Sequence, residues 1–423
     1  MSSTTGTEPG PRRIALLGNV ANCLVPVALA LREAGITADL FVDDGAPQVA
    51  TPENARPELR DAPWVRRGPW FPWWSALAPW RSPVVRALRS YDAVVVSGPG
   101  AMYAQFSGRP YGWWVSGHDL TAAPFPWAFR ATYRSWSRRL AAFPLGAWQR
   151  RALRRARAVW VQPFAPFEEA IARLHLGSPP VRAEYLPLIV EGMAEPAPAA
   201  PDPALTPLLA RMAAADLTVF HPSRMMLRST PTTRRSGQWK GNDRLFEGVA
   251  ELARRRPDVS VLVVVIDASM SPEVAAAQAR IAQLGLAESV AWARPAGGAS
   301  FSRPQMRELY AACDVVAVEF AAGWFGNVAL EGLAMGRPVV SHLDAGAMAR
   351  LYPAGHPMVS AGTTDEIASA LEGLLDPVRR AELGEAGVAW VRRHHTLDAA
   401  GPRYVAAISA TLGPGQGDEP LHP

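Results

Sequence analysis

Short apolar runs alternate with helical stretches along most of this chain. Strands are predicted where the runs end at glycine or polar residues, at 13–17, 36–42, 93–97, 111–116, 158–162, 217–220, 259–266, 290–293, 315–318 and 338–342. Helices are predicted at 23–34, 243–255, 272–283, 305–312 and 328–335. Apolar strands separated by helices are typical of a parallel sheet that helices cover on both faces, so the sequence predicts an α/β protein.

A Pro/Ala-rich stretch, 193–207, interrupts this alternation. Its composition does not suit regular helix or sheet and predicts a semi-rigid linker. The linker separates an N-terminal Rossmann-like, doubly wound domain, 12–192, from a C-terminal one, 208–395. Two such domains that face each other place a cleft at the carboxyl ends of both sheets, where ligands of this class bind. The polar ends, 1–11 and 413–423, are predicted to be disordered tails.

Composition narrows the functional classes. The chain has 423 residues, enough for two cores, and 49% of them are hydrophobic. The only cysteines, Cys23 and Cys313, lie far apart and indicate neither a disulfide framework nor a structural zinc site. The N-terminus lacks the apolar core of a signal peptide, and no apolar run approaches the roughly 20 residues of a membrane span, so a cytoplasmic protein is expected. A net charge of +5 suits anionic ligands but is too small to indicate nucleic acid.

One basic position differs from all the others. Lys240 is the single lysine among 43 basic residues. Because lysine is a compact point charge and arginine a planar fork, a buried phosphate pocket can discriminate between them. Chance retention is the alternative, but Lys240 opens the sequence Lys-Gly-Asn-Asp directly before a predicted helix. This position favours a phosphate-binding role.

Three segments of the second half indicate one kind of ligand. Arg224 follows a strand, Lys240 precedes a helix, and a glycine-flanked turn runs into a helix that carries Glu331. Glycines allow close backbone approach, and free N–H groups at a helix start favour an anion. The two cations, Arg224 and Lys240, match the charge of a diphosphate. The Glu331 carboxylate, one turn inside its helix, can accept hydrogen bonds from two neighbouring sugar hydroxyls. The sequence therefore predicts a nucleotide-sugar ligand. The candidate donor-binding residues are Arg224, Lys240, Gly323, Trp324, Phe325, Gly326, Asn327 and Glu331.

These motifs resemble a known family. The stretch 311–340 begins with Ala-Ala-Cys-Asp-Val-Val and ends with Ala-Leu-Glu-Gly-Leu-Ala-Met-Gly-Arg-Pro-Val-Val, which is similar to the donor-binding signature of family 4 glycosyltransferases. Those enzymes are retaining and have the GT-B fold, with two facing Rossmann-like domains. The resemblance covers most of 215–410 and implies that Arg224 and Lys240 contact the donor diphosphate. It also implies that 396–412 is a closing helix that returns to the N-terminal domain.

In the first half the resemblance rests on architecture and on the sequence Gly117-His118-Asp119. It implies that His118 lines the reaction centre, as a catalytic residue that positions groups and stabilises charge without covalent attack. A capping or packing histidine is the alternative. Asp119 could orient His118 or contact the acceptor or a phosphate. Gly18 and Asn19, at the end of the first strand, are candidates for the same contacts, although a plain turn explains them equally well.

The chain departs from the family pattern in two places. The family's usual glutamate, eight positions before Glu331, is replaced by Gly323, and Glu319 could take that place only with a rearranged loop. The segment between Arg224 and Lys240 is longer than usual and polar, which predicts a mobile loop at 230–236.

No metal site is predicted. The Asp-Asp pair at 43–44 is not a metal-binding Asp-x-Asp motif, and GT-B enzymes generally need no metal. The neutralising charge would come from Lys240, a helix start and Arg224, or Arg234 or Arg235 in its place. No cofactor is expected beyond a nucleotide-diphosphate sugar as co-substrate.

A basic, aromatic segment lies at 124–157. It carries nine arginines, and no acidic residue occurs between Asp119 and Glu168. A basic amphipathic helix can lie on an anionic membrane surface or bind an anionic acceptor. A core-facing aromatic stripe with a solvated basic face is the better-supported alternative. The tryptophans from Trp64 to Trp80 either stack on a ligand or form a local core, and the sequence does not choose between these.

The sequence therefore predicts a retaining glycosyltransferase that moves a sugar from a nucleotide-diphosphate sugar to an acceptor. The acceptor would be a small molecule, a glycan or a lipid-linked molecule, in glycan or secondary-metabolite biosynthesis. Three alternatives stay open: a nucleotide-sugar epimerase of the same fold, a pyridoxal-phosphate phosphorylase with Lys240 as the Schiff base, and a non-catalytic homologue that binds the nucleotide sugar. The arginine-rich composition suggests a bacterial source.

Overall fold

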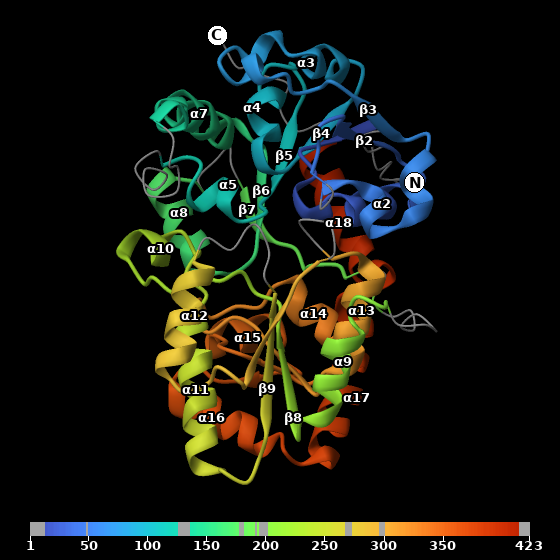
Figure 1. The fold of residues 1–423 in the computed structure, drawn as a ribbon. Coiled ribbons are helices and arrows are strands. Elements are labelled where there is room, and N and C mark those ends of the chain that lie inside the picture. The colour runs from blue at the N-terminus through green and yellow to red at the C-terminus, as the bar shows by residue number, and fades with distance from the viewer. Residues whose placement is uncertain are drawn as a thin grey trace, which may run out of the picture. The chain divides into compact units, whose positions relative to one another are not determined.

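The computed structural model describes residues 13–47, 50–125, 136–176, 182–190, 193, 202–266, 273–295 and 301–413. The chain forms two compact units (Figure 1). The first comprises residues up to Gln162, Phe167–Pro187 and the chain from Ala400 onward. The second comprises Pro163–Pro166 and Leu188–Ala399. The sequence-based domain boundaries, the linker and the closing helix stay predictions.

The first unit contains a seven-stranded parallel sheet in the order β3-β2-β1-β4-β5-β6-β7. Its strands are β1 (Arg13–Leu17), β2 (Thr37–Asp43), β3 (Val65–Gly68), β4 (Ala93–Val96), β5 (Tyr111–Trp114), β6 (Ala158–Val161) and β7 (Arg182–Tyr185). The strand order changes direction between β1 and β4, so loops at their carboxyl ends diverge there and leave room for a ligand.

Helices and short 3₁₀ turns connect these strands. They are η1 (Val20–Asn22), α1 (Val25–Glu33), α2 (Pro52–Ala55), η3 (Pro57–Asp61), η4 (Trp73–Ala76), η5 (Pro79–Arg81), α3 (Pro83–Leu88), η6 (Gly98–Gly100), α4 (Ala101–Ala104), α5 (His118–Thr121), α7 (Trp136–Arg155) and α8 (Ala165–Leu174).

The second unit contains a six-stranded parallel sheet in the order β10-β9-β8-β11-β12-β13. Its strands are β8 (Leu217–His221), β9 (Val261–Ile266), β10 (Val290–Ala293), β11 (Val315–Ala317), β12 (Val339–Ser341) and β13 (Val359–Ser360). Its helices are α9 (Thr206–Ala214), α10 (Pro231–Arg235), α11 (Asn242–Arg255), α12 (Val274–Gln283), α13 (Arg303–Ala312), α14 (Asn327–Ala334), α15 (Ala345–Leu351), α16 (Thr364–Gly373) and α17 (Pro377–His394). The direction of strand order changes between β8 and β11.

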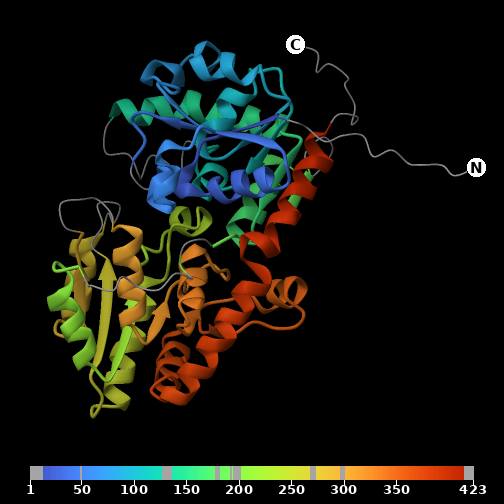
Figure 2. The same cartoon turned by 90° about the vertical axis from the view of Figure 1, so that its right-hand side faces the viewer.

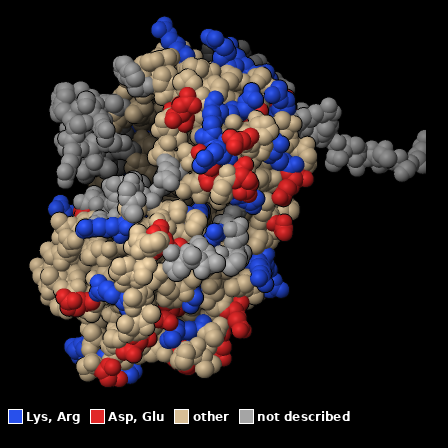
Figure 3. Space-filling view, turned by 45° about the vertical axis from the view of Figure 1, so that its right-hand side comes forward, with Lys and Arg blue, Asp and Glu red and all other residues tan. Residues whose placement is uncertain are grey.

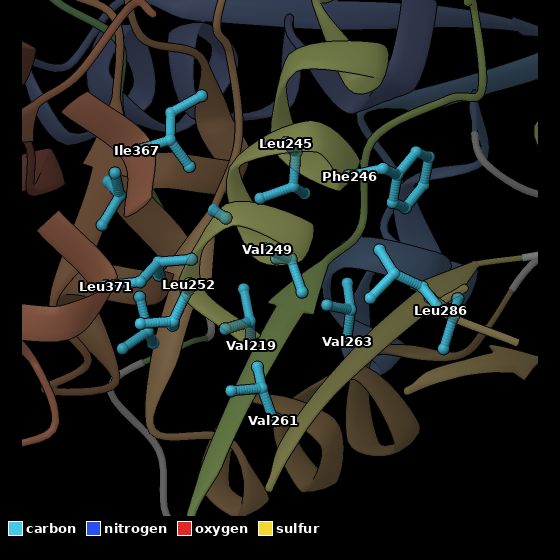
Figure 4. Close-up of a cluster of buried hydrophobic side chains, with 14 of the residues drawn as sticks. Val219, Leu245, Phe246, Val249, Leu252, Val261, Val263, Leu286, Ile367 and Leu371 are labelled. Atoms are coloured by element: carbon cyan, nitrogen blue, oxygen red, sulfur yellow. The ribbon is translucent and has the colours of Figure 1, made fainter. Parts of the chain in front are cut away.

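The core of the second unit lies where α11 and α16 pack on the sheet (Figure 4). Along α11, Leu245, Val249 and Leu252 recur at a spacing of three and four residues, so they share one helix face and are fully buried. Ile367 and Leu371 on α16 meet them. Truncating such a side chain to alanine costs about 2–5 kcal/mol. This rigid platform fixes the start of α11, where the candidate site lies.

Most predicted elements are present with shifted ends. Several helices, among them α3, α8, α9 and α15, were not predicted, and five further features differ. Strands β3, β7 and β13 were missed because they are short and, in β3, polar at two of four positions. The mobile loop predicted at 230–236 is wrong, because α10 forms there with a capping box between Thr230 and Thr233. The last two residues of the predicted linker already belong to α9, where proline is tolerated in the first turn. Both predicted tails lie outside the described residues, apart from Gly413.

The last helix, α18 (Leu397–Leu412), follows α17 closely (Figure 2). Its residues from Ala400 onward belong to the first unit, although they lie more than two hundred residues from the end of that unit's sheet. Tyr404 anchors it there, because its hydroxyl donates to the Pro187 carbonyl at 2.6 Å and its ring lies 5.2 Å from that of Trp114.

Candidate functional site

The end of β8 is held by a buried polar network. His221 is fully buried, its Nδ1 lies 2.6 Å from the Ala317 carbonyl, and its Nε2 lies 2.7 Å from Asn242 Nδ2. The Asn242 Oδ1 accepts from the Met226 amide at 3.0 Å, so Nδ2 must donate to His221 and Nδ1 must carry the proton. Burial lowers the pKa of His221 to about 4, which keeps the ring neutral. The network ties β8, β11 and the start of α11 together.

Lys240 lies just before α11 and forms an ion pair with Glu319. Its Nζ is 2.5 Å from Glu319 Oε2, and the two side chains are 26% and 13% exposed. The Lys240 carbonyl accepts from the Phe320 amide at 2.9 Å, which joins the two loops through the backbone as well. Gly241 caps α11 in the left-handed region, where an added Cβ would lie 2.8 Å from Phe320 Cβ. Glycine is therefore required at this turn.

Arg224 lies near the same carboxylate. Its charge interacts with Glu319, while burial lowers the pKa of the guanidinium. Burial also raises the pKa of Glu319, and the charges of Lys240 and Arg224 oppose that rise. Among the described residues, two buried polar atoms here lack a hydrogen-bond partner: Arg224 Nε and Glu319 Oε1. Unmet buried groups are costly, and they are frequent at sites that bind a ligand or water.

Glu319 was not expected here. From the sequence, Glu319 could take the place of the family's glutamate at Gly323 only with a rearranged loop, and in the structure it pairs with Lys240. Adjacency of β8 and β11 brings Glu319 and Arg224 together, because each follows the carboxyl end of its strand. That rule could have identified Glu319 from the sequence.

The turn before α14 contains the remaining glycine-rich candidates. Gly323 has a positive φ of 76°, and its carbonyl accepts from the Asp344 amide at 2.7 Å. Gly326 and Asn327 are exposed at the start of α14, whose first residues have no side-chain cap. An exposed helix start without a side-chain cap is a place where an anion can bind.

Trp324 and Phe325 have their side chains inside the protein. Each is 3% exposed, and their rings stack with centroids 4.5 Å apart. Phe325 also lies 5.7 Å from both Trp390 and His395, in a buried aromatic cluster. The rings therefore pack the turn in place, and Gly326 and Asn327 are the exposed residues beside them.

Glu331 is buried on α14 and already has two partners. Arg303 Nη1 donates to its Oε1 at 2.5 Å, and the Tyr310 hydroxyl donates to its Oε2 at 2.9 Å. Burial and the charge of Glu331 raise the pKa of Tyr310, so the hydroxyl stays protonated. The sequence analysis missed both partners, which lie on α13. A carboxylate has about four lone-pair positions, so Glu331 keeps acceptor capacity while its orientation is fixed.

The arginines offered as substitutes for Arg224 lie in or beside α10. Arg234 and Arg235 are exposed. Arg234 Nε lies 2.5 Å from Ser229 Oγ, and its guanidinium lies 5.0 Å from the Trp239 ring centroid. Arg234 thus has a local role in shaping the segment before Lys240.

In the first unit, one candidate residue, His118, has an exposed side chain, and the other candidates hold the surrounding loops in place. His118 is exposed as the first residue of α5. Asp119 is 4% exposed and accepts from the Gly98 amide at 3.0 Å, the Gly117 amide at 2.8 Å and Trp113 Nε1 at 2.9 Å. With its oxygens bonded to the protein, Asp119 holds the turn that presents His118.

Gly18 and Asn19 also organise loops. An added Cβ on Gly18 would overlap the Ser97 carbonyl oxygen, so only glycine fits between β1 and the start of η6. Asn19 Nδ2 donates to Asn22 Oδ1 at 2.7 Å and to the Ala50 carbonyl at 2.9 Å, while its Oδ1 accepts from the Leu24 amide at 3.1 Å. The plain-turn alternative accounts for these contacts.

Within the described ranges, no group of three His, Cys, Asp or Glu side chains is arranged to hold a metal ion. In the same ranges no helix combines the length and the apolar character needed to cross a membrane.

Comparisons with known proteins connect this geometry to a family. Residues 232–377, which include Lys240, Glu319, the α14 turn and Glu331, match the family model described as glycosyl transferases group 1. Over these residues the chain is similar to group 1 glycosyltransferases, in agreement with the family that its motifs resemble. The resemblance found in the sequence is thereby confirmed.

Curated relatives match the chain over part of their length. D-inositol 3-phosphate glycosyltransferase of Corynebacterium aurimucosum is 34% identical over 159 residues, which cover 36% of each chain. The GDP-mannose-dependent alpha-(1-6)-phosphatidylinositol monomannoside mannosyltransferase of Mycolicibacterium smegmatis is 30% identical over 174 residues, 40% of this chain and 44% of that protein. The chain thus spans less than half the length of these curated relatives.

Solved structures share the fold over nearly the whole chain. A glycosyltransferase from Rickettsia africae superposes with a TM-score of 0.62 at 14% identity, covering 95% of this chain and 99% of the other. WaaG, a glycosyltransferase involved in lipopolysaccharide biosynthesis, gives a TM-score of 0.56 at 14% identity, covering 94% and 99%. These likenesses confirm the predicted GT-B fold of two Rossmann-like domains.

Proposed function

We propose that this chain is a glycosyltransferase that moves a sugar from a nucleotide-diphosphate sugar to an acceptor, with retention at the anomeric carbon. The observation that carries the proposal is the group formed by Arg224, Lys240 and Glu319 at the start of α11, on the carboxyl edge of the second sheet. A nucleotide diphosphate needs fixed positive charge and backbone donors in one place, and this edge supplies both.

The diphosphate is assigned to Arg224, Lys240 and the starts of α11 and α14. The lysine ammonium has three donors, so Lys240 can keep its bond to Glu319 while it donates to a phosphate oxygen. Arg224 has a partly buried guanidinium that is poorly hydrated and pairs well with phosphate. Together the three side chains carry a net charge of about +1, which an anionic donor would complement.

The donor sugar is assigned to Glu319. The family's usual carboxylate is absent, since Gly323 has no side chain. Glu319 has one oxygen on Lys240 and one, Oε1, without a partner among the described residues. A sugar hydroxyl would supply the missing donor. Glu331, fixed by Arg303 and Tyr310, is assigned to the ribose hydroxyls.

His118 is assigned to the reaction centre in a supporting role. It is exposed on a turn that Asp119 holds rigidly, so its ring can reach a ligand without a large change in the backbone. It would position the acceptor or the transferring sugar and stabilise charge. Gly18, Asn19 and Asp119 keep the surrounding loops in place, and their backbone groups stay candidates for a phosphate or acceptor contact.

The residues of this site also bear on the competing functions. A Schiff base would consume the Lys240 amine, whereas here Lys240 Nζ forms an ion pair with Glu319 Oε2 at 2.5 Å, which disfavours the pyridoxal-phosphate alternative. A nucleotide-sugar epimerase and a non-catalytic homologue use the same nucleotide site, so product analysis must separate them from a transferase.

The acceptor is proposed to be a small molecule, a glycan or a lipid-linked molecule, and the protein is proposed to act in the cytoplasm. Peripheral membrane contact through 124–157 is part of this proposal. Residues 126–135 of that segment lie outside the described residues.

The test is a panel of UDP- and GDP-sugars, measured for binding by calorimetry and for hydrolysis by release of the nucleoside diphosphate. Wild type and Lys240→Ala are compared with Arg254→Gln, a control on α11 whose side chain is 73% exposed. We expect binding of at least one donor, strong loss in Lys240→Ala and none in the control. Binding of no nucleotide sugar would refute the proposal, and an epimerised donor in the product would replace the transferase by the epimerase.

A further inference from the structure

Positive charge is concentrated in one continuous part of the chain. Residues 62–167 contain fifteen arginines, no lysine and two acidic residues, so their formal charge is +13, whereas the whole chain carries +5 and the rest of it therefore −8. One acid, Asp119, is buried, and the other, Asp92, accepts from the Arg13 amide at 2.9 Å. Such asymmetry within a chain indicates interaction with an anionic partner.

The same part of the chain exposes large apolar side chains. Among the described residues, six large hydrophobic side chains are exposed, and four of them lie between residues 62 and 167. They are Trp74 at 38%, Leu77 at 59%, Trp80 at 47% and Phe143 at 44%. The tryptophans from Trp64 to Trp80 therefore differ in exposure: Trp64 is only 8% exposed and belongs to the core, whereas Trp74 and Trp80 are exposed.

Ring contacts connect Trp80 to helix α7, which carries Phe143. The rings of Trp80, Phe106 and Trp148 lie 5.5–5.9 Å apart in edge-on pairs, and the Arg151 guanidinium lies 5.8 Å from the Phe106 ring. Trp80 is in η5 and Trp148 in α7, and α7 runs beside α4 (Figure 1). Leu77 connects η4 and η5.

One face of α7 extends this surface. Phe143, Ala147, Arg151 and Arg154 recur every three or four residues, so they share a face, and all four are exposed. Arg81 and Arg86, which follow Trp80 in η5 and α3, are also exposed. We call Trp74, Leu77, Trp80, Phe143 and these exposed arginines the basic aromatic surface.

One view of the surface is not uniformly basic. Figure 3 shows one face of the molecule, on which acidic and basic side chains are interspersed. Because the chain outside residues 62–167 carries a formal charge of −8, the excess of positive charge is a local property of residues 62–167.

We propose that the basic aromatic surface binds the surface of an anionic lipid bilayer. Its exposed tryptophans and Leu77 suit the level where acyl chains meet headgroups. Its arginines come from a stretch with only two acidic residues and suit anionic headgroups. Single-stranded nucleic acid would also attract arginine, but it needs open ring faces for stacking. Here the rings pack on one another edge-on, and Leu77 offers no stacking surface. The proposed membrane surface includes residues 74–86 in addition to the segment 124–157. The proposal is independent of the proposed sugar transfer.

The experiment is co-sedimentation of the full chain with vesicles of phosphatidylcholine alone or mixed with phosphatidylglycerol. We expect binding to the mixed vesicles at low salt, little binding to the neutral ones, and release as salt rises, because charge attraction is screened beyond about 8–10 Å. Arg151→Gln and Arg154→Gln should each weaken binding about fivefold, and Leu77→Ser roughly tenfold.

Matched controls lie in the second unit. Val378, at 64% exposure, is as accessible as Leu77, and Arg228, whose side chain is 78% exposed, serves as the control for the arginines. Leu77 is preferred to Trp80 as a test because Trp80 packs on two other rings and its loss could disturb the fold. Thermal melts of all variants verify folding.

The proposal is overturned by any of three results. The first is recovery in the supernatant with anionic vesicles at low salt. The second is equal weakening in Val378→Ser and Leu77→Ser. The third is a Leu77-dependent association with single-stranded oligonucleotides or with a second copy of the chain in place of vesicles.

Discussion

Removing Lys240 should damage donor binding in two separable ways. Lys240→Ala deletes a charge-assisted contact to the diphosphate, which costs about 1.5–3 kcal/mol. It also leaves Glu319 without its partner, 2.5 Å away in the intact protein. A carboxylate roughly 6 Å from one phosphate charge repels it by about 3 kcal/mol at an effective dielectric constant of about 20. The combined loss is about 4.5–6 kcal/mol, or roughly two thousand- to twenty-five-thousand-fold in affinity.

The part of the loss that comes from repulsion by Glu319 can be reversed by a second substitution. In Lys240→Ala combined with Glu319→Gln, the repelling charge is absent, so binding of a bare nucleoside diphosphate should recover by roughly 10- to 100-fold relative to Lys240→Ala alone. Calorimetric titration of the four variants of this cycle measures the coupling. Glu251→Gln is the matched control, since Glu251 is also an ion-paired glutamate of the second unit, with a side chain that is 17% exposed.

Lys240→Arg completes the test of why one lysine persists in an arginine-rich chain. It keeps the charge but needs more room beside Glu319, and we expect a loss of about tenfold. The reasoning is refuted if Lys240→Ala binds nucleoside diphosphates as wild type does. It is also refuted if the double variant binds no better than Lys240→Ala, because Glu319 would then not act on the ligand.

Three other substitutions or conditions test the remaining assignments. Glu331→Gln should weaken nucleotide binding about tenfold and lower the melting temperature. Arg303→Gln should lower the melting temperature as well, but with a smaller effect on affinity. Equal affinity in Glu331→Gln and wild type would remove Glu331 from the ribose site. His118→Ala should reduce turnover by about 10²–10⁴ with donor affinity nearly unchanged, and near-wild-type turnover would exclude His118 from the reaction centre. Burial raises the pKa of Glu319 above that of an ordinary glutamate, so acidification neutralises this side chain earlier and frees Lys240. The affinity for a nucleotide-diphosphate sugar, which has no phosphate titrating near neutrality, should therefore rise as the pH is lowered from neutrality. That rise should vanish in Glu319→Gln, and a rise of the same size in both proteins would contradict the assignment.

The architecture could be predicted because its signals are local. Apolar runs such as Val261–Ile266 are buried on both sheet faces, and α11 carries its apolar residues at helical spacing, so both are visible in the sequence. The positions after β8 and before α11 follow from the same pattern. Arg224 and Lys240 could therefore be named, since strand ends of a parallel sheet meet at one edge.

The partners of these residues could not be predicted in the same way. The pairs Lys240–Glu319 and Arg303–Glu331 join residues that lie 79 and 28 positions apart, and only the packing of loops and helices brings them together. Trp324 and Phe325 showed the opposite difficulty. A glycine-flanked turn indicated ligand contact, but the burial of both rings depends on Trp390 and His395, which lie far along the chain.

Gly323 and Glu319 together explain how the site could keep a carboxylate where the family's usual one is absent. A glutamate side chain at position 323 would lie beside Asp344, because an added Cβ there is 3.4 Å from Asp344 Cβ, and the backbone φ of 76° disfavours any side chain. The turn therefore suits glycine, and the negative charge comes from Glu319 at the end of β11, where Lys240 and Arg224 offset it. Restoring the family residue by Gly323→Glu should accordingly lower stability by about 1 kcal/mol or more without raising donor affinity, whereas Glu319→Gln should reduce the preference for a nucleotide sugar over the bare nucleoside diphosphate. If Gly323→Glu instead binds the sugar more tightly and Glu319→Gln leaves that preference unchanged, the carboxylate function belongs to position 323 and Glu319 serves Lys240 alone.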